Sequence, residues 1–153
     1  MSRPLACLLV CLGLVAGCDP VDEPVAAPPP PTEVRHDLGP ITSRFAELGT
    51  PVSASWVTRD SNAPGDRVPG PTDYWLDAVV RLDPVTWLRL KTQYDPIEQG
   101  HRPEVQELLR SQLPKGPFLT SGALELAFTT PSLASYAYLD AEGNNLVLLS
   151  TGT

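Results

Sequence analysis

The clearest strand pattern in the chain is the stretch from Tyr74 to Leu82, which reads YWLDAVVRL. Its even-numbered residues are all apolar or aromatic, whereas its odd-numbered residues include Asp77 and Arg81. Alternation with a period of two is typical of a strand in an antiparallel sheet that has one covered face and one wetter face. This stretch therefore predicts a sheet at the centre of the fold.

Patterns on both sides of this strand predict further elements. Apolar residues spaced three and four apart predict helices, and alternating residues predict strands. Asp83-Pro84 indicates a helix start, because Asp accepts hydrogen bonds from free backbone N–H groups and Pro fits the first turn. Gly143-Asn144 predicts the turn of a hairpin. The expected elements are, in chain order, a helix over 41–48, strands over 52–58 and 74–82, helices over 83–94 and 103–113, and strands over 124–128, 136–139 and 146–149.

The expected strands cluster along the chain instead of alternating strictly with helices. Such an order favours the α+β class. We expect residues 41–153 to form a single α+β domain with a mainly antiparallel five-stranded sheet. About three helices should pack on one face of this sheet, and a disordered tether should precede the domain.

A short apolar run opens the chain. The uncharged stretch from Leu5 to Ala16 follows Arg3 and has 12 residues. As a helix it would reach only about 18 Å, which is short of the ~30 Å hydrocarbon core of a bilayer. We therefore interpret it as the core of a signal peptide and not as a permanent membrane span.

This run ends at Val15-Ala16-Gly17-Cys18, and residues 1–18 resemble the precursors of bacterial lipoproteins. The resemblance implies cleavage of a signal peptide over residues 1–17 and attachment of a diacylglyceryl group to the sulfur of Cys18. It also implies a lipid anchor in the cell membrane or envelope, with the domain on the extracytoplasmic side. The chain departs from the family in having one basic residue before the apolar run, where two or more are usual. An ordinary cleaved signal beside a chance cysteine is the alternative interpretation.

Residues 18–40 are expected to form the lipidated Cys18 and a Pro-rich linker. From Asp19 to Pro40 there are seven prolines in 22 residues. Proline fixes φ and removes a backbone donor, so the segment favours an extended polyproline II spacer. Pro28 to Pro31 would alternatively suit an aromatic groove of a partner protein. His36 is interpreted as a solvated linker residue.

Cysteine content and charge exclude several functions. The only cysteines are Cys7, Cys11 and Cys18, so cleavage and lipidation would leave no free thiol for a disulfide, a thiolate metal site or a thiol enzyme. The net charge is −7, whereas a protein that binds nucleic acids or anionic lipids needs clustered Lys and Arg. We expect no nucleic-acid partner, and the lipid bilayer is a partner only through the acyl groups on Cys18.

Two features are candidates for binding a protein partner. The segment 59–72, RDSNAPGDRVPGPT, is long for a connection between strands and carries Arg59, Asp60, Asp66 and Arg67. Trp75 shares a strand face with charged residues, and an exposed indole ring is a good anchor for a protein contact. The alternative interpretation is a stiff surface loop and a core tryptophan. The other two tryptophans, Trp56 and Trp87, are expected in the core.

Catalytic patterns are sparse. His101 is the only histidine of the expected domain, so a serine or carboxylate hydrolase would have to use it. Asp95, Glu98 and His101 are three residues apart, but no HExxH pattern is present, and we expect neither a metal nor a cofactor. The sequence therefore favours a non-catalytic, lipid-anchored binding module of unknown specific role. This class includes a scaffold and an acidic immunity or inhibitor protein for a basic partner, and a small envelope hydrolase using His101 is the alternative.

Overall fold

The structure, a computed structural model, describes residues 33–60 and 74–152. These residues form a six-stranded sheet of order β1-β2-β6-β5-β4-β3, in which all neighbouring strands are antiparallel. The class is α+β, as expected, but the sheet has six strands and not five. The elements are α1 (Gly39–Arg44), η1 (Ala46–Leu48), β1 (Ser53–Asp60), β2 (Tyr74–Arg81), α2 (Pro84–Tyr94), β3 (Ile97–Glu98), η2 (Glu107–Gln112), β4 (Phe118–Thr120), α3 (Gly122–Phe128), β5 (Ala134–Asp140) and β6 (Asn145–Gly152), where η marks a 3-10 helix.

The predicted strand at Tyr74 is confirmed as β2, which lies between β1 and β6. One of its faces packs under the helices, as the even-numbered apolar residues predict. The other face is not exposed to solvent in the middle of the strand, because Asp77 and Val79 are only 4% and 8% exposed. Both faces of β2 are therefore covered.

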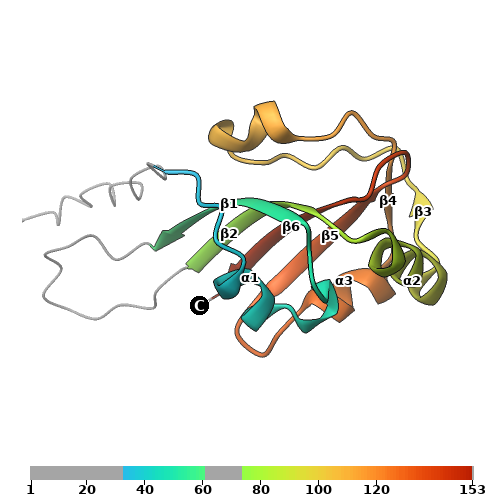
Figure 1. The fold of residues 1–153 in the computed structure, drawn as a ribbon, viewed down its shortest axis with the longest axis horizontal. Helices are drawn as coiled ribbons and strands as arrows, with labels where there is room; N and C mark the ends of the chain where they lie inside the picture. Colours follow the sequence, from blue (N-terminus) through green and yellow to red (C-terminus); the bar gives the residue numbers. More distant parts are fainter. Residues whose placement is uncertain (1–32, 61–73, 153) are drawn as a thin grey trace, which may run out of the picture.

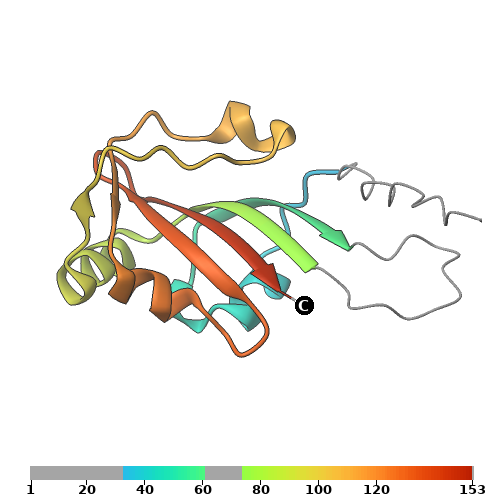
Figure 2. The same cartoon turned by 180° about the vertical axis from the view of Figure 1, so that it is seen from behind.

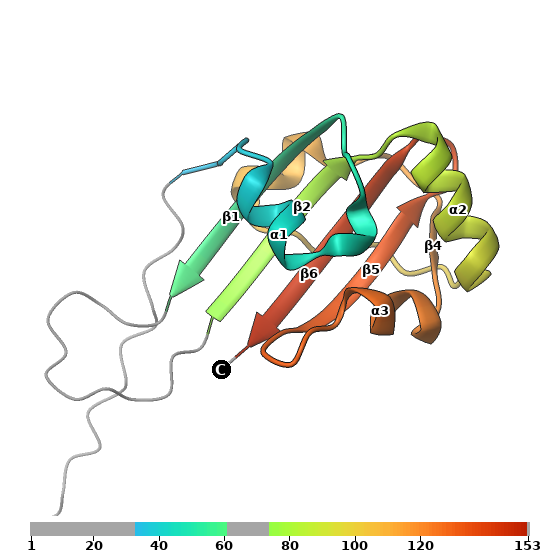
Figure 3. The same ribbon diagram turned by 60° about the horizontal axis from the view of Figure 1, so that its bottom comes forward.

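The helices α1, α2 and α3 lie over one face of the sheet (Figure 3). The helix predicted over 83–94 is confirmed, and Asp83 caps it by accepting hydrogen bonds from the backbone N–H groups of Val85 and Thr86. The helix predicted over 41–48 splits at Phe45, whose φ of −122° and ψ of 83° separate α1 from η1. The core between this layer and the sheet contains Ile41, Phe45, Leu48, Leu90, Leu124, Phe128 and the inward side chains of β1, β2, β5 and β6.

The opposite face is covered by the segment 99–117, which we call the arm. It leaves the sheet after β3, runs along the sheet and returns to β4 (Figures 1 and 2). Val105 and Leu109 of the arm pack against Val57, Val79 and Val147 of the strands. The expectation that all helical segments lie on one face is therefore wrong, because η2 belongs to this second layer.

Two predicted elements have a different conformation. Residues 124–128, expected as a strand, lie in α3, where the Ser121 hydroxyl caps the helix by accepting from the Leu124 N–H. Helical spacing buries Leu124 and Phe128 together and leaves Leu126 72% exposed. The helix expected over 103–113 is only the 3-10 turn η2. Gln106 precedes it with an extended ψ of 150° and gives its backbone N–H to Asp77 instead of to a helical carbonyl.

Residues 33–38, which we call the strap, run along the outer edge of β1. The backbone N–H of Arg35 donates to the Trp56 carbonyl at 2.8 Å, and the Trp56 N–H donates to the Arg35 carbonyl at 2.9 Å. His36, expected to be solvated, is exposed but has its Nδ1 within 3.2 Å of the Ala54 carbonyl. The folded part thus begins before residue 41, because the strap pairs with the sheet. No helix of the described segments is long and apolar enough to cross a bilayer.

Candidate binding groove

Two adjoining hollows lie on the helix-covered face, at the end of the sheet where β2 begins. They share Arg44 and Tyr74, and we call them together the groove. The first hollow, about 380 Å³, is completed by Thr130, Ser132 and Leu133. The second, about 210 Å³, is completed by Arg35, Pro40, Ile41, Trp56, Thr58 and Leu76.

Arg44 and Tyr74 form the partition between the two hollows. The guanidinium carbon of Arg44 lies 4.6 Å from the centre of the Tyr74 ring, and its Nη1 donates a hydrogen bond to the Tyr74 hydroxyl. No carboxylate of the described residues is within ion-pair distance of Arg44. A guanidinium has five N–H donors, so this side chain can hold Tyr74 and still bind an anion.

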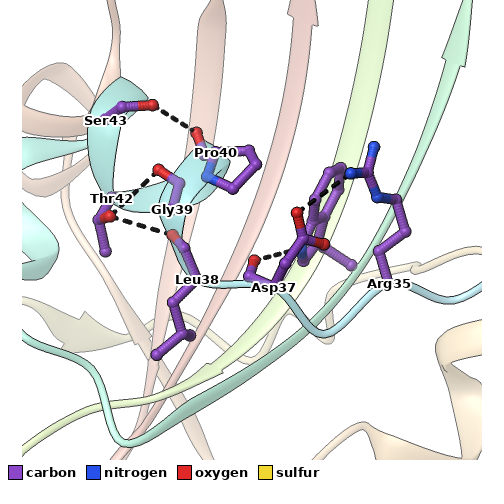
Figure 4. Close-up of polar contacts among 8 residues, drawn as sticks. Arg35, Asp37, Leu38, Gly39, Pro40, Thr42 and Ser43 are labelled. Atoms are coloured by element: carbon purple, nitrogen blue, oxygen red, sulfur yellow. Dashed lines mark hydrogen bonds and ion pairs between the residues drawn. The ribbon is translucent and has the colours of Figure 1, made fainter.

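The position of Arg44 follows from the local structure of α1. Ile41 and Phe45, on either side of it along the helix, are buried in the core and fix the rotation of the helix. Arg44 is exposed in the last turn, where a positive charge is favoured by the free helical carbonyl groups. The start of the helix is held by the Thr42 hydroxyl, which donates to the carbonyls of Leu38 and Gly39 (Figure 4).

The strap brings a second arginine to the groove. The guanidinium of Arg35 lies 4.2 Å from the centre of the Trp56 ring. Figure 4 shows that it also faces Asp37, with which it forms an ion pair at 3.0 Å. The Trp56 indole N–H donates to the Asp37 carbonyl at 2.9 Å, so the ring, the strap and Arg35 are fixed together. Arg35 differs from Arg44 because its charge is already paired.

The far wall of the groove is the turn between α3 and β5. Beneath it, the hydroxyls of Ser135 and Ser150 form a buried hydrogen bond at 2.8 Å across β5 and β6. A side chain at Gly152 would overlap the Ser132 carbonyl group, so this turn packs directly against the end of β6. Thr130 and Ser132, whose hydroxyl oxygens lie 3.4 Å apart, therefore line the groove on a supported turn.

Of the residues that the sequence suggested for partner binding, two meet in the described part of the chain. Arg59 and Trp75 are cross-strand partners, with the guanidinium 5.5 Å from the indole ring centre. Trp75 is half-buried and packs against the arm-side core, so it lies on the opposite face from the groove. Cys18, Asp66, Arg67 and the side chain of Asp60 lie outside the described residues.

The aromatic residues expected in the core are buried to different extents. Trp56 is 2% exposed, and its ring closes the groove on one side. Trp87 is partly buried and its indole N–H donates to the Asp140 carbonyl at 3.1 Å. Trp56 thus forms part of the groove wall, whereas Trp87 is not among the residues that line the groove.

His101 lies apart from the groove. It is exposed and lines a hollow of about 150 Å³ with Glu98, Arg102 and Lys115. No serine or threonine is among the described residues that line this hollow. Within the described residues there is also no group of three or more His, Cys, Asp or Glu side chains arranged to hold a metal ion.

The sequence did not point to the groove. Its two arginines come from the strap and from α1, and its aromatic rings come from β1 and β2. Arg35 belongs to the expected linker, and Arg44 lies on the exposed side of an expected helix. No local pattern in the sequence therefore marked either of them as a binding residue. The groove has to be interpreted from its own chemistry, because no family model matches the chain and neither a curated protein nor a solved structure matches it.

Proposed function

We propose that this protein is a lipid-anchored binding module of the bacterial cell envelope and that the groove is its partner-binding surface. The anchor is supported by Val15-Ala16-Gly17-Cys18 after a short apolar run, and the spacer by the prolines that follow it. The observation that carries the binding role is the Arg44 guanidinium. It is exposed at a hollow and has no carboxylate partner among the described residues.

The chemistry of the groove favours binding over catalysis. The described residues that line it supply guanidinium groups, aromatic rings, hydroxyls and apolar side chains. They include no histidine or carboxylate to act as a general base for the hydroxyls. Such a set can hold an anionic group by charge-assisted hydrogen bonds and can pack an apolar group beside it.

The chain path also suits an anchored module. Residue 33 of the strap lies toward the Asp60 end of β1, because Arg35 pairs with Trp56 in an antiparallel register. The groove lies at this end of the sheet, because Tyr74, the partner of Asp60, lines both of its hollows. At ~3.1 Å per residue, the stretch from Cys18 to Glu33 spans about 45 Å when extended, which is enough to hold the domain clear of lipid headgroups.

The anchor is tested by labelling native cells with radioactive palmitate. Wild-type protein should be labelled and a Cys18→Ser variant should not, because serine has no sulfur to form the thioether with the diacylglyceryl group. Absence of label from the wild type, together with an unmodified N-terminus in the intact mass, would show that no anchor exists.

The binding role is tested separately by photo-crosslinking in cells. A photoreactive amino acid at Ser132 lies in the groove, whereas the same amino acid at the exposed Gln112 lies on the arm. We expect a discrete adduct from position 132 and none of the same mass from position 112. Equal adduct patterns from both positions would contradict a role for the groove.

A further inference from the structure

We propose that the groove binds the free C-terminal carboxylate of a peptide chain whose last residues are apolar. This inference rests on the proposed binding role and names the chemistry of the partner. Arg44 receives the carboxylate, and the 380 Å³ hollow beside it receives the side chain of the last residue. The volume lies within the range of pockets that enclose small ligands.

The charge count favours one carboxylate over a polyanion. Of the two arginines in the groove, Arg35 is already paired with Asp37 at 3.0 Å, which leaves Arg44 as the cation without a carboxylate among the described residues. The whole chain carries a net charge of −7, so a partner with many negative charges would be repelled at long range. A single terminal carboxylate satisfies Arg44 without adding that repulsion.

The lining beside Arg44 suits a chain end more than a free inorganic anion. Thr130 and Ser132 present hydroxyl groups that can donate to a carboxylate or accept from a peptide N–H. The Tyr74 ring and Pro40, both half-buried, supply apolar contact surface, whereas Leu133, Ile41 and Leu76 are at most 6% exposed. A phosphate ion would use the donors but leave this apolar surface uncovered.

Tyr74 is a positioning residue in this scheme. Its hydroxyl accepts one N–H of Arg44 and its ring lies under the guanidinium, so the Arg44 side chain is held where it lines both hollows. Fixing a long side chain before the ligand arrives lowers the entropy lost on binding. Removing the hydroxyl should therefore weaken binding less than removing the charge.

The experiment uses purified full-length chain and four acetylated tetrapeptides, acetyl-Ala-Ala-Ala-X, with X an alanine, valine, leucine or phenylalanine. Each peptide is made with a free C-terminal acid and with a C-terminal amide. Binding is followed by the NMR shift of the Trp56 indole N–H, which sits at the groove, and by calorimetry. We expect at least one acid to bind, the matched amide to bind at least about tenfold more weakly, and Arg44→Gln to weaken the acid about ten- to a hundredfold.

Two variants complete the design. Arg81→Gln removes the same charge from an exposed residue at the other end of β2 and should leave binding of the acid unchanged. Tyr74→Phe should weaken it only a few-fold. The inference would be overturned by any of three results. The amides bind as well as the acids, the Arg44→Gln variant binds the acid normally, or no acid binds. A crosslink at Ser132 in cells would then still support the proposed binding role with a partner of another chemistry.

Discussion

The buried carboxyl group of Asp77 accepts a hydrogen bond at 2.9 Å from the backbone N–H of Gln106. This contact joins the middle of β2 to the arm, across a core of apolar residues. Burial raises the pKa of Asp77 to about 6, although the Gln106 N–H lowers it in part. The arm is thus fastened to the sheet at an acid group whose ionisation is unfavourable in the fold.

Asp77 should make a distinctive contribution to the pH dependence of stability. Its pKa is about 6 in the folded protein and has the ordinary value of 3.8 once the chain is unfolded, so the folded state holds the proton more tightly. As the pH rises, Asp77 ionises at a lower pH in the unfolded chain than in the folded protein. Its contribution to the free energy of unfolding therefore falls between about pH 4 and pH 6. The loss should approach about 3 kcal/mol above that window.

Asp77→Asn tests this, because the amide stays neutral while its carbonyl oxygen can still accept from Gln106. Relative to wild type, the variant should gain unfolding free energy at pH 7.5 and much less at pH 4.5, as measured by urea denaturation. Asp95→Asn, at an exposed residue, is the control and should show no such trend. If the wild type and the Asp77→Asn variant differed in unfolding free energy by the same amount at both pH values, burial would not disfavour the charge.

Gly152→Ala should destabilise the protein and distort the groove. An added methyl group would overlap the carbonyl group of Ser132, and backbone atoms cannot move aside cheaply. We expect a loss of about 1–3 kcal/mol in thermal or urea unfolding. Gly122→Ala is the matched control, because open space surrounds Gly122 and it should cost nothing. Equal stability of the two variants would contradict the close packing of this turn on β6.

Arg35→Pro should loosen the strap. Proline removes the backbone N–H that donates to the Trp56 carbonyl, and leaving that carbonyl unpaired should cost about 1–3 kcal/mol. Arg35→Gln keeps the N–H and removes only the charge, so it should cost less than about 1 kcal/mol. Hydrogen exchange at the Trp56 amide gives the readout, with faster exchange expected only in the proline variant. Similar exchange in both variants would mean that the strap does not protect the edge of β1.

His101→Ala should leave stability unchanged within about 0.5 kcal/mol, because His101 is exposed. It should also leave peptide binding in the groove unchanged, since His101 lines a different hollow. Any hydrolysis of ester or peptide substrates by the purified chain should persist in the variant. Loss of such an activity on substitution would support the alternative of an envelope hydrolase.

The elements that were predictable from the sequence are those with strong local signals. The strand at Tyr74 alternates over its whole length, and α2 begins at a capping Asp83 followed by Pro84. Residues 124–128 alternate as well as a strand does, but the Ser121 cap and the burial of Leu124 with Phe128 select a helix. For so short an apolar segment, tertiary packing decides between the two conformations.

Two features had no strong local signal in the sequence and were not predictable from it. One is that both faces of the sheet are covered, and the other is the groove. Val105 and Leu109 have helical spacing, but their segment docks on Asp77 as extended chain followed by a 3-10 turn. The groove joins Arg35, Arg44 and Tyr74 from three separate elements. The strap, the packing of α1 on the core and the place of β2 in the sheet bring them together, and no pattern in the sequence shows that these three elements are neighbours.

Binding of an anionic group by the groove is tested by comparing two charge reversals in cells that carry the photo-crosslinker at Ser132. Arg44→Glu places a negative charge in the groove, and Arg81→Glu places the same charge at the far end of β2. We predict that the adduct disappears in the first variant and persists in the second, with equal amounts of folded protein. An adduct of undiminished yield in Arg44→Glu would contradict binding of an anionic group by this groove.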